Sequence, residues 1–166
     1  SFDDPGGEDA VLVAGGTGLA PMIFSARTWK RRGGRGRLYL VHGAASRDES
    51  PDASFEADFD KVFRATMDGS AGFSGDVVTL LAKLLDEGRI SAPLLYSCGP
   101  AGMVRALVER TGDRFKSHHT SLEAVMACGV GACRGCTVPL REEGSIVFKT
   151  VCDDGTVFRA SDIAWE

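Results

Sequence analysis

Four cysteines constrain most strongly what this chain can fold into. Cys128, Cys133 and Cys136 follow the spacing C-x4-C-x2-C, and Cys152 comes later in the chain. This is the plant-type ligand spacing of a [2Fe–2S] cluster, in which one tight loop supplies three thiolates and another segment supplies the fourth. Such a loop must also bring backbone N–H groups close to the cluster sulfurs, and glycine permits that approach. The glycines that suit this role are Gly129, Gly131 and Gly135.

The residues alone leave two other uses of these cysteines open. Structural zinc sites usually carry two short C-x2-4-C pairs, whereas one arm of this pattern is a single cysteine. Disulfides are typical of small secreted domains, which a chain of 166 residues with 5 cysteines and 43% hydrophobic residues does not resemble. A zinc-stabilised α/β interaction domain without a redox role therefore remains the alternative from a different class.

Charge and hydropathy narrow the range of partners. The net charge of −4 gives no reason to expect binding to nucleic acid or to an anionic membrane. No apolar run approaches the roughly 20 residues that a membrane-spanning helix needs. Cysteines that must stay reduced to hold a cluster indicate a cytoplasmic protein.

Before residue 117 the hydrophobic pattern of the sequence predicts strands that alternate with helices. Apolar runs predict strands at 10–14, 38–42, 64–67 and 93–98. Helical spacing predicts a helix from about Pro21 to Gly33, a second over 55–63, a third after the capping residue Asp76, and a fourth around 103–108. This order predicts an α/β fold with a mostly parallel sheet and helices on both of its faces.

The glycine turn after the first strand is a candidate binding site for a nucleotide. A strand, the turn Gly15–Gly18 and a helix follow in direct succession, and free N–H groups and the helix dipole favour an anion there. Many such turns need glycine for geometry alone, so that interpretation stays open. No acidic residue ends the 38–42 strand to take a ribose hydroxyl, and Arg47 beyond it could meet a 2′-phosphate.

After residue 117 the predicted alternation of strands and helices ends. The cysteine loop is followed by two predicted strands, 137–141 and 145–151, around a turn at 142–144. The sequence therefore predicts two domains, a nucleotide-binding domain over residues 1–117 and a cluster-binding domain over residues 118–166.

Five segments, taken in order, carry a resemblance to a known family. They are GGTGLAP, DGSAGFSG, YSCGPAGM, SLEAVMACGVGACRGCTVP and VCDDGTVF. From Val11 to Trp165 the chain closely resembles the electron transfer subunit of dihydroorotate dehydrogenase, a branch of the ferredoxin reductase-like flavoproteins. The resemblance implies the Rossmann-like parallel sheet of the ferredoxin reductase NAD module, followed by a small β-rich [2Fe–2S] cluster-binding subdomain.

The resemblance also implies roles for particular residues, none of them a catalytic side chain. Four thiolates would hold the cluster: Cys128, Cys133, Cys136 and Cys152. A first turn would meet the dinucleotide phosphates and the flavin edge: Gly15, Gly16, Thr17 and Gly18. A second turn would form the nicotinamide pocket: Cys98, Gly99 and Pro100. A loop on the dinucleotide side would add Asp68 and Gly69.

The family's route takes hydride from NADH to FAD, and then single electrons through the cluster to an FMN in a separate catalytic subunit of dihydroorotate dehydrogenase, in pyrimidine biosynthesis. This implies a hetero-oligomer with that subunit. The alternative within the superfamily is a module of another NAD(P)H-dependent oxidoreductase complex. The family carries a flavin-binding β-barrel before the glycine turn, and this sequence starts shortly before that turn. We therefore expect FAD to be shared with a domain outside these residues, and the chain alone to be inactive.

Overall fold

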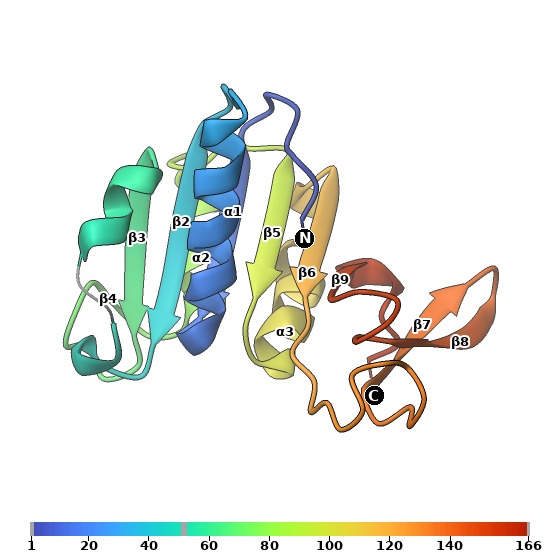
Figure 1. Ribbon diagram of the computed structural model, residues 1–166. Coiled ribbons are helices and arrows are strands. Elements are labelled where there is room, and N and C mark those ends of the chain that lie inside the picture. The colour runs from blue at the N-terminus through green and yellow to red at the C-terminus, as the bar shows by residue number, and fades with distance from the viewer. Residues whose placement is uncertain (1, 51–52, 166) are drawn as a thin grey trace.

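The computed structural model describes residues 2–50 and 53–165 (Figure 1). Its strands are β1 (Ala10–Gly15), β2 (Leu38–Ala44), β3 (Lys61–Thr66), β4 (Phe73–Ser74), β5 (Leu94–Cys98), β6 (Ser117–Ser121), β7 (Thr137–Glu142), β8 (Ser145–Thr150) and β9 (Val157–Arg159). Within these residues one large sheet has the order β4-β3-β2-β1-β5-β6-β9, while β7 and β8 pair separately. Neighbours in the large sheet are parallel, except that β9 runs antiparallel to β6. The predicted α/β fold with a mostly parallel sheet is confirmed.

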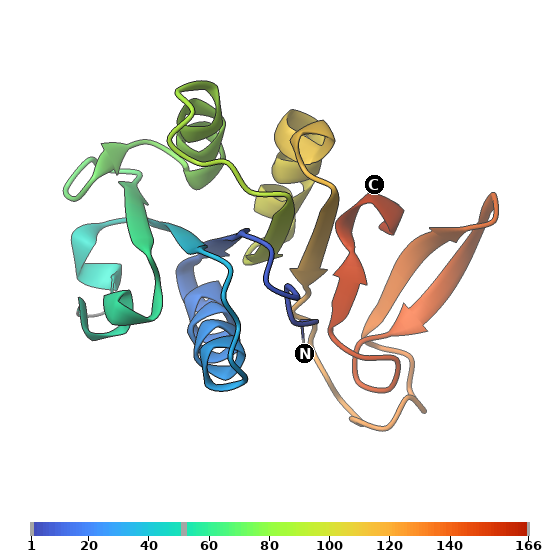
Figure 2. The ribbon, with the colours of Figure 1, turned by 90° about the horizontal axis from the view of Figure 1, so that it is seen from above.

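Helices cover both faces of the large sheet. Figure 2 shows α1 (Leu19–Arg31) on one side, and α2 (Val77–Asp86) and α3 (Ala101–Thr111) on the other. Side chains alternate along β1, so that Leu12 packs in the core on the α1 side while Val11 and Val13 pack in the core on the opposite side. Burial on both faces explains why the predicted strand reads as a continuous apolar run.

The helix α2 begins as its sequence predicts. Asp76 precedes α2, and its Oδ1 accepts a hydrogen bond from the backbone N–H of Thr79 at 2.8 Å. Its Oδ2 accepts from the Thr79 hydroxyl at 2.7 Å. This N-cap satisfies a backbone donor that the helix itself cannot use.

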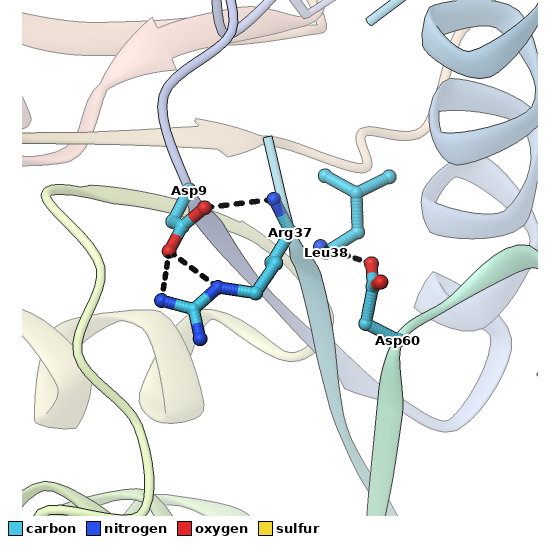
Figure 3. A network of polar contacts seen from close by, with 4 residues as sticks. All are labelled: Asp9, Arg37, Leu38 and Asp60. Atoms are coloured by element: carbon cyan, nitrogen blue, oxygen red, sulfur yellow. Dashed lines mark hydrogen bonds and ion pairs between the residues drawn. The ribbon is translucent and has the colours of Figure 1, made fainter. Parts of the chain in front are cut away.

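Two aspartates accept hydrogen bonds at the amino ends of β1, β2 and β3 (Figure 3). The Asp9 carboxylate accepts hydrogen bonds from the backbone N–H of Arg37 at 2.8 Å and from its guanidinium at 2.6 and 2.9 Å. Asp60 accepts from the N–H of Leu38 at 2.8 Å. These contacts fix where β2 begins beside β1 and β3. The Arg37 guanidinium holds the pKa of Asp9 below its ordinary value.

We expect Asp9→Asn to lower the melting temperature by about 2 °C near neutral pH. The folded-state pKa of Asp9 lies below the value of 3.8 expected in the unfolded chain. Its ionised form therefore stabilises the fold above the unfolded-state pKa, and this contribution is lost as the pH falls through the folded-state pKa. Thermal unfolding of both proteins across acid pH measures the difference, with the exposed Asp48→Asn as the control. A difference that stays constant down to full protonation would contradict the role of this carboxylate.

The helix predicted over residues 55–63 is wrong. A 3-10 helix spans Ala53–Asp58, and β3 then contains Val62 and Phe63. Phe55 and Val62 belong to the core on the α1 side, whereas Phe63 packs in the core on the opposite face of the sheet. The helical spacing arises because two short elements each contribute apolar residues to the core. The strand predicted at 64–67 accordingly begins earlier, at Lys61.

The hairpin predicted after the cysteine loop is confirmed by β7 and β8, which pair from Thr137↔Thr150 to Glu142↔Ser145. It packs with the chain end around a small core of its own: Cys136, Val138, Leu140, Val151, Phe158 and Ile163. The predicted domain boundary falls at the start of β6, a strand that pairs with β5. The division at residues 117/118 stays a prediction.

None of the helices in the described residues is long and apolar enough to span a membrane.

Candidate cluster and nucleotide sites

The hairpin brings the two arms of the cysteine pattern together. Cys136 directly precedes β7, and Cys152 follows shortly after β8, so the pair Thr137↔Thr150 places both at the same end of the hairpin. The Cys136 and Cys152 sulfurs lie 3.4 Å apart. This separation is well beyond the roughly 2.05 Å of a disulfide, and all five cysteines are free.

Backbone N–H groups of the cysteine loop point at its sulfurs. The N–H of Gly131 donates to Cys152 Sγ at 3.1 Å, and the N–H of Cys133 donates to Cys128 Sγ at 3.4 Å. The N–H of Gly135 donates to Cys133 Sγ, also at 3.4 Å. Gly131 has φ of 73°, a conformation that L side chains rarely adopt. The loop therefore has the donor geometry that the sequence pattern required.

These contacts change the acidity of the thiols. Hydrogen bonds from the backbone, that of Cys133 first, lower the pKa of Cys128 to about 6. The pKa of Cys136 is lowered by the backbone of Cys152 and then by its thiol. The thiolate is the form that binds metal, so the lowered pKa values of Cys128 and Cys136 suit soft metal ligation, whereas the neighbouring Cys136 thiol raises the pKa of Cys152. The donor set and its N–H partners thus fit a [2Fe–2S] cluster. Within the described residues, no three or more His, Cys, Asp or Glu side chains converge as a site for a metal ion.

The fifth cysteine lies in a different environment. Cys98 ends β5 and is fully buried beneath the glycine turn. Burial raises the pKa of its thiol to about 11, so it stays protonated at neutral pH. It is therefore chemically unlike the loop cysteines.

A cavity of about 320 Å³ opens at the carboxyl ends of the parallel strands. Its walls come from the turns after β1, β2, β3 and β5, where ligands bind in sheets of this kind. Among the predicted residues, Gly15, Gly16 and Pro100 line it. The other lining residues are Gly43, Ala44, Ala45, Glu49, Met67, Gly75, Asp76, Val77 and Met103.

The remaining predicted nucleotide residues lie beside this cavity or behind it. A Cβ on Gly18 would lie 2.1 Å from the Cys98 carbonyl oxygen, so the two turns touch backbone to backbone. Gly99 makes the matching approach, since a Cβ there would lie 3.1 Å from the Cα of Gly15. Bare backbone at these positions lets the turn after β1 approach the end of β5 closely, which supports the geometric interpretation of Gly18.

Asp68 and Gly69 form a turn that supports the cavity edge. The Asp68 carboxylate accepts from the N–H and the hydroxyl of Ser70, at 2.9 and 2.6 Å. The Ser70 hydroxyl oxygen in turn accepts from the backbone N–H of Arg47 at 2.8 Å. The loop after β3 is thereby tied to the loop after β2.

The two candidate sites meet at one contact. The Thr17 hydroxyl donates to Glu123 Oε1 at 3.3 Å, joining the glycine turn to the segment that leads into the cysteine loop. The strand β6 explains this proximity, because it runs parallel to β5 and delivers Glu123 at the same edge of the sheet. The sequence interpretation missed β6 and this contact.

The sequence interpretation also missed Glu49 and Met103. Glu49 lies in a 3-10 turn, Arg47–Glu49, that folds back toward the end of β2. A search for acidic residues within a few positions after β2, and not only at its last residue, would have identified Glu49.

A parallel sheet with a cavity at its glycine turn, followed by a cysteine loop, places the chain in the ferredoxin reductase-like class. An NADH-dependent reduced ferredoxin-NADP oxidoreductase has a similar structure, with a TM-score of 0.77 and 28% identity, covering 95% of this chain and 54% of that one. An Amycolatopsis cytochrome P450 reductase is similar with a TM-score of 0.56 and 25% identity, covering 71% of this chain and 38% of that one.

Sequence comparison finds more specific relatives within this class of protein. Residues 123–164 match the iron–sulfur cluster binding domain of dihydroorotate dehydrogenase B. The dihydroorotate dehydrogenase B electron transfer subunit of Fusobacterium nucleatum is 36% identical, over 96% of this chain and 59% of that subunit. The subunit of Geobacillus thermodenitrificans is 38% identical, over 96% and 58%. The chain is a sequence relative of these electron transfer subunits and spans about three fifths of their length.

Proposed function

We propose that this chain is the NAD-binding and cluster-binding part of an electron transfer subunit serving dihydroorotate dehydrogenase. The observation that carries the proposal is the cysteine loop, with the sulfurs of Cys136 and Cys152 side by side at one end of the hairpin and backbone N–H groups directed at three of the four sulfurs. Its position beside the glycine turn, through the Thr17–Glu123 contact, supports a joint role in moving electrons.

In this proposal the protein supplies binding, positioning and electrostatics. Cys128, Cys133, Cys136 and Cys152 hold the [2Fe–2S] cluster, which supplies one-electron chemistry when bound. The loop N–H groups stabilise the negative charge of its sulfur ligands. The cavity at Gly15 and Gly16 binds NADH, with the turn at Cys98–Pro100 forming its wall.

The proposed partners are those that the family resemblance implies. NADH is the electron donor, FAD mediates between hydride and single electrons, and the FMN-containing catalytic subunit is the acceptor in a hetero-oligomer. We place this assembly in the cytoplasm, where thiols stay reduced. We also propose residues 1–117 and 118–166 as its nucleotide-binding and cluster-binding domains.

A second candidate is a module of another NAD(P)H-dependent oxidoreductase complex. It is favoured by the similarity to the NADH-dependent reduced ferredoxin-NADP oxidoreductase, which extends over 95% of this chain. Co-purification from the native host, with and without dihydroorotate dehydrogenase, separates the two.

Iron and acid-labile sulfide analysis of anaerobically purified protein tests the cluster. We expect about two irons and two sulfides per chain, with visible absorption bands that dithionite bleaches. Zinc at a stoichiometric level with no visible colour would refute the proposal and favour the zinc-stabilised domain.

A further inference from the structure

A second cavity, of about 280 Å³, opens at the β3–β4 edge of the large sheet. Figure 1 shows this edge at the opposite end of the sheet from β9 and the cysteine loop. Within residues 2–50 and 53–165, β4 pairs only with Ala65 and Thr66, so the earlier part of β3 has no strand beside it on this edge. The cavity lies there, between β3, the loop that leads into β4, and α2.

The inner surface of this cavity is apolar. Leu80 and Leu84 of α2 line it and are buried, while Phe63 of β3 and Phe73 of β4 line it and are half-buried. Two aromatic rings and two leucines at the base of an open hollow provide a surface on which the apolar part of a ligand can pack.

Two cations stand at this apolar surface. Lys83 Nζ lies 5.7 Å from the centroid of the Phe73 ring, and Arg89 Cζ lies 5.1 Å from the centroid of the Phe63 ring. These cation–π contacts hold both charged groups beside the cavity. Glu87 is the carboxylate that serves both, at 3.8 Å from Lys83 and 3.7 Å from Arg89, which is beyond hydrogen-bond distance. Both side chains therefore keep donors for a further acceptor.

The charge of the cavity walls is one-sided. Among the described residues that line it, none is acidic. Arg64 lines it as well, but its guanidinium is committed to Glu56 at 2.6 Å. The cavity at the glycine turn differs, because Glu49 and Asp76 are part of its walls. The cavity beside β3 is therefore the one suited to an anion that also carries an apolar group.

We propose that this cavity binds a small amphiphilic anion. The apolar body of the ligand packs on Phe63, Phe73 and the α2 leucines, and its carboxylate or phosphate group pairs with Lys83 and Arg89. The inference does not rest on the proposed function, because the cavity shares no lining residue with the one at the glycine turn.

Calorimetric titration of the purified chain at low ionic strength tests the ligand class with four probes. Benzoate and phenyl phosphate carry both an apolar ring and an anionic group, and we expect at least one of them to bind with a Kd on the order of 1 mM. The tighter of the two identifies the preferred anionic group. Benzyl alcohol lacks the charge and inorganic phosphate lacks the ring, so each should bind at least about tenfold more weakly.

Two variants test the position of the site. Arg89→Gln and Lys83→Gln should each weaken binding of the preferred probe about tenfold, because each removes a charged donor. Arg31→Gln is the matched control, since Arg31 is an exposed arginine that lines a different hollow on α1. Binding to that variant should be unchanged. Addition of NADH should not displace the probe.

Three results would overturn the inference. The first is that neither benzoate nor phenyl phosphate binds the unaltered chain. The second is binding that Arg89→Gln and Lys83→Gln leave unchanged, or that Arg31→Gln weakens equally. The third is displacement of the probe by NADH with no effect of the two variants, which would place the anion at the glycine turn instead. Melting curves confirm that the variants are folded, as expected for exposed side chains.

Discussion

Cys136→Ser is expected to yield a protein that loses most of its iron and sulfide and whose hairpin β7–β8 no longer holds its structure. Cys136 is the one loop cysteine that is buried, at 4% exposure, and it belongs to the small core beneath the hairpin. Its sulfur lies beside that of Cys152, so a serine there removes a ligand and disturbs the arm that supplies another. A two-stranded hairpin is marginally stable by itself, so the cluster is expected to contribute much of its stability.

Iron and sulfide content, together with hydrogen exchange across residues 137–150, measure both effects. Cys98→Ser is the matched control, since it makes the same chemical change in a buried cysteine outside the loop. It should keep its cluster at a modest cost in stability from placing a hydroxyl in the core. Equal loss of iron in both variants would contradict the assignment of Cys136 as a ligand.

The alternation of strands and helices was predictable because each element carries a local signal. β1 is buried on both faces and is therefore apolar throughout. Asp76 predicts the start of α2, because it is a residue type that caps helices, and the structure shows this cap. The cysteine spacing likewise indicates cluster binding, because the thiols of a ligand loop must lie close enough to bind the same cluster. These features depend on residues close to one another in the chain.

What the sequence could not predict depends on tertiary contacts between polar residues. β6 reads Ser-His-His-Thr-Ser, which carries no apolar pattern, yet it sits inside the large sheet. Its buried His118 bonds to the Ser97 hydroxyl at 2.8 Å, and the Thr120 hydroxyl donates to the Ser97 carbonyl at 3.2 Å. Burial lowers the pKa of His118 to about 4, so it is neutral and tolerated there. Polar partners thus replace the apolar signal that marks the other strands.

The position of the cavity at the glycine turn was predictable, but the roles of its glycines were not. Parallel strands place their following turns at one edge of the sheet, so Gly15, Asp68 and Cys98 were expected near one another. Whether a given glycine packs against the fold or leaves room for a ligand depends on what lies opposite it. That depends on tertiary packing, which the sequence pattern does not reveal.

Gly18→Ala is expected to destabilise the fold by about 3 kcal/mol or more, independently of any ligand. The added Cβ would lie 2.1 Å from the Cys98 carbonyl oxygen and 2.5 Å from the carbonyl carbon. Both are backbone atoms of Cys98 at the end of β5, so relief requires moving the turn after β1 away from β5 rather than rotating a side chain. Such overpacking cannot be absorbed in a close-packed interior.

Two other glycines provide the controls for this effect. Gly102 lies in α3 with nothing within 4 Å of an added Cβ, so Gly102→Ala should stabilise the chain by about 0.5–1 kcal/mol through helix propensity. Gly16 lines the cavity in equally open space but at φ of 52°, so Gly16→Ala should fold at a cost of about 1 kcal/mol. Its methyl group would occupy space at the cavity wall and weaken NADH binding.

Chemical denaturation of the three variants, with NADH titration of those that fold, separates a structural glycine from a binding one. The expected pattern is a large loss of stability for Gly18→Ala, unchanged binding for Gly102→Ala, and folded protein with weaker NADH binding for Gly16→Ala. A Gly18→Ala protein as stable as the unaltered chain would show that the turn after β1 can move away from the end of β5 without cost. The close backbone contact between the two turns would then not be what holds this edge of the sheet together.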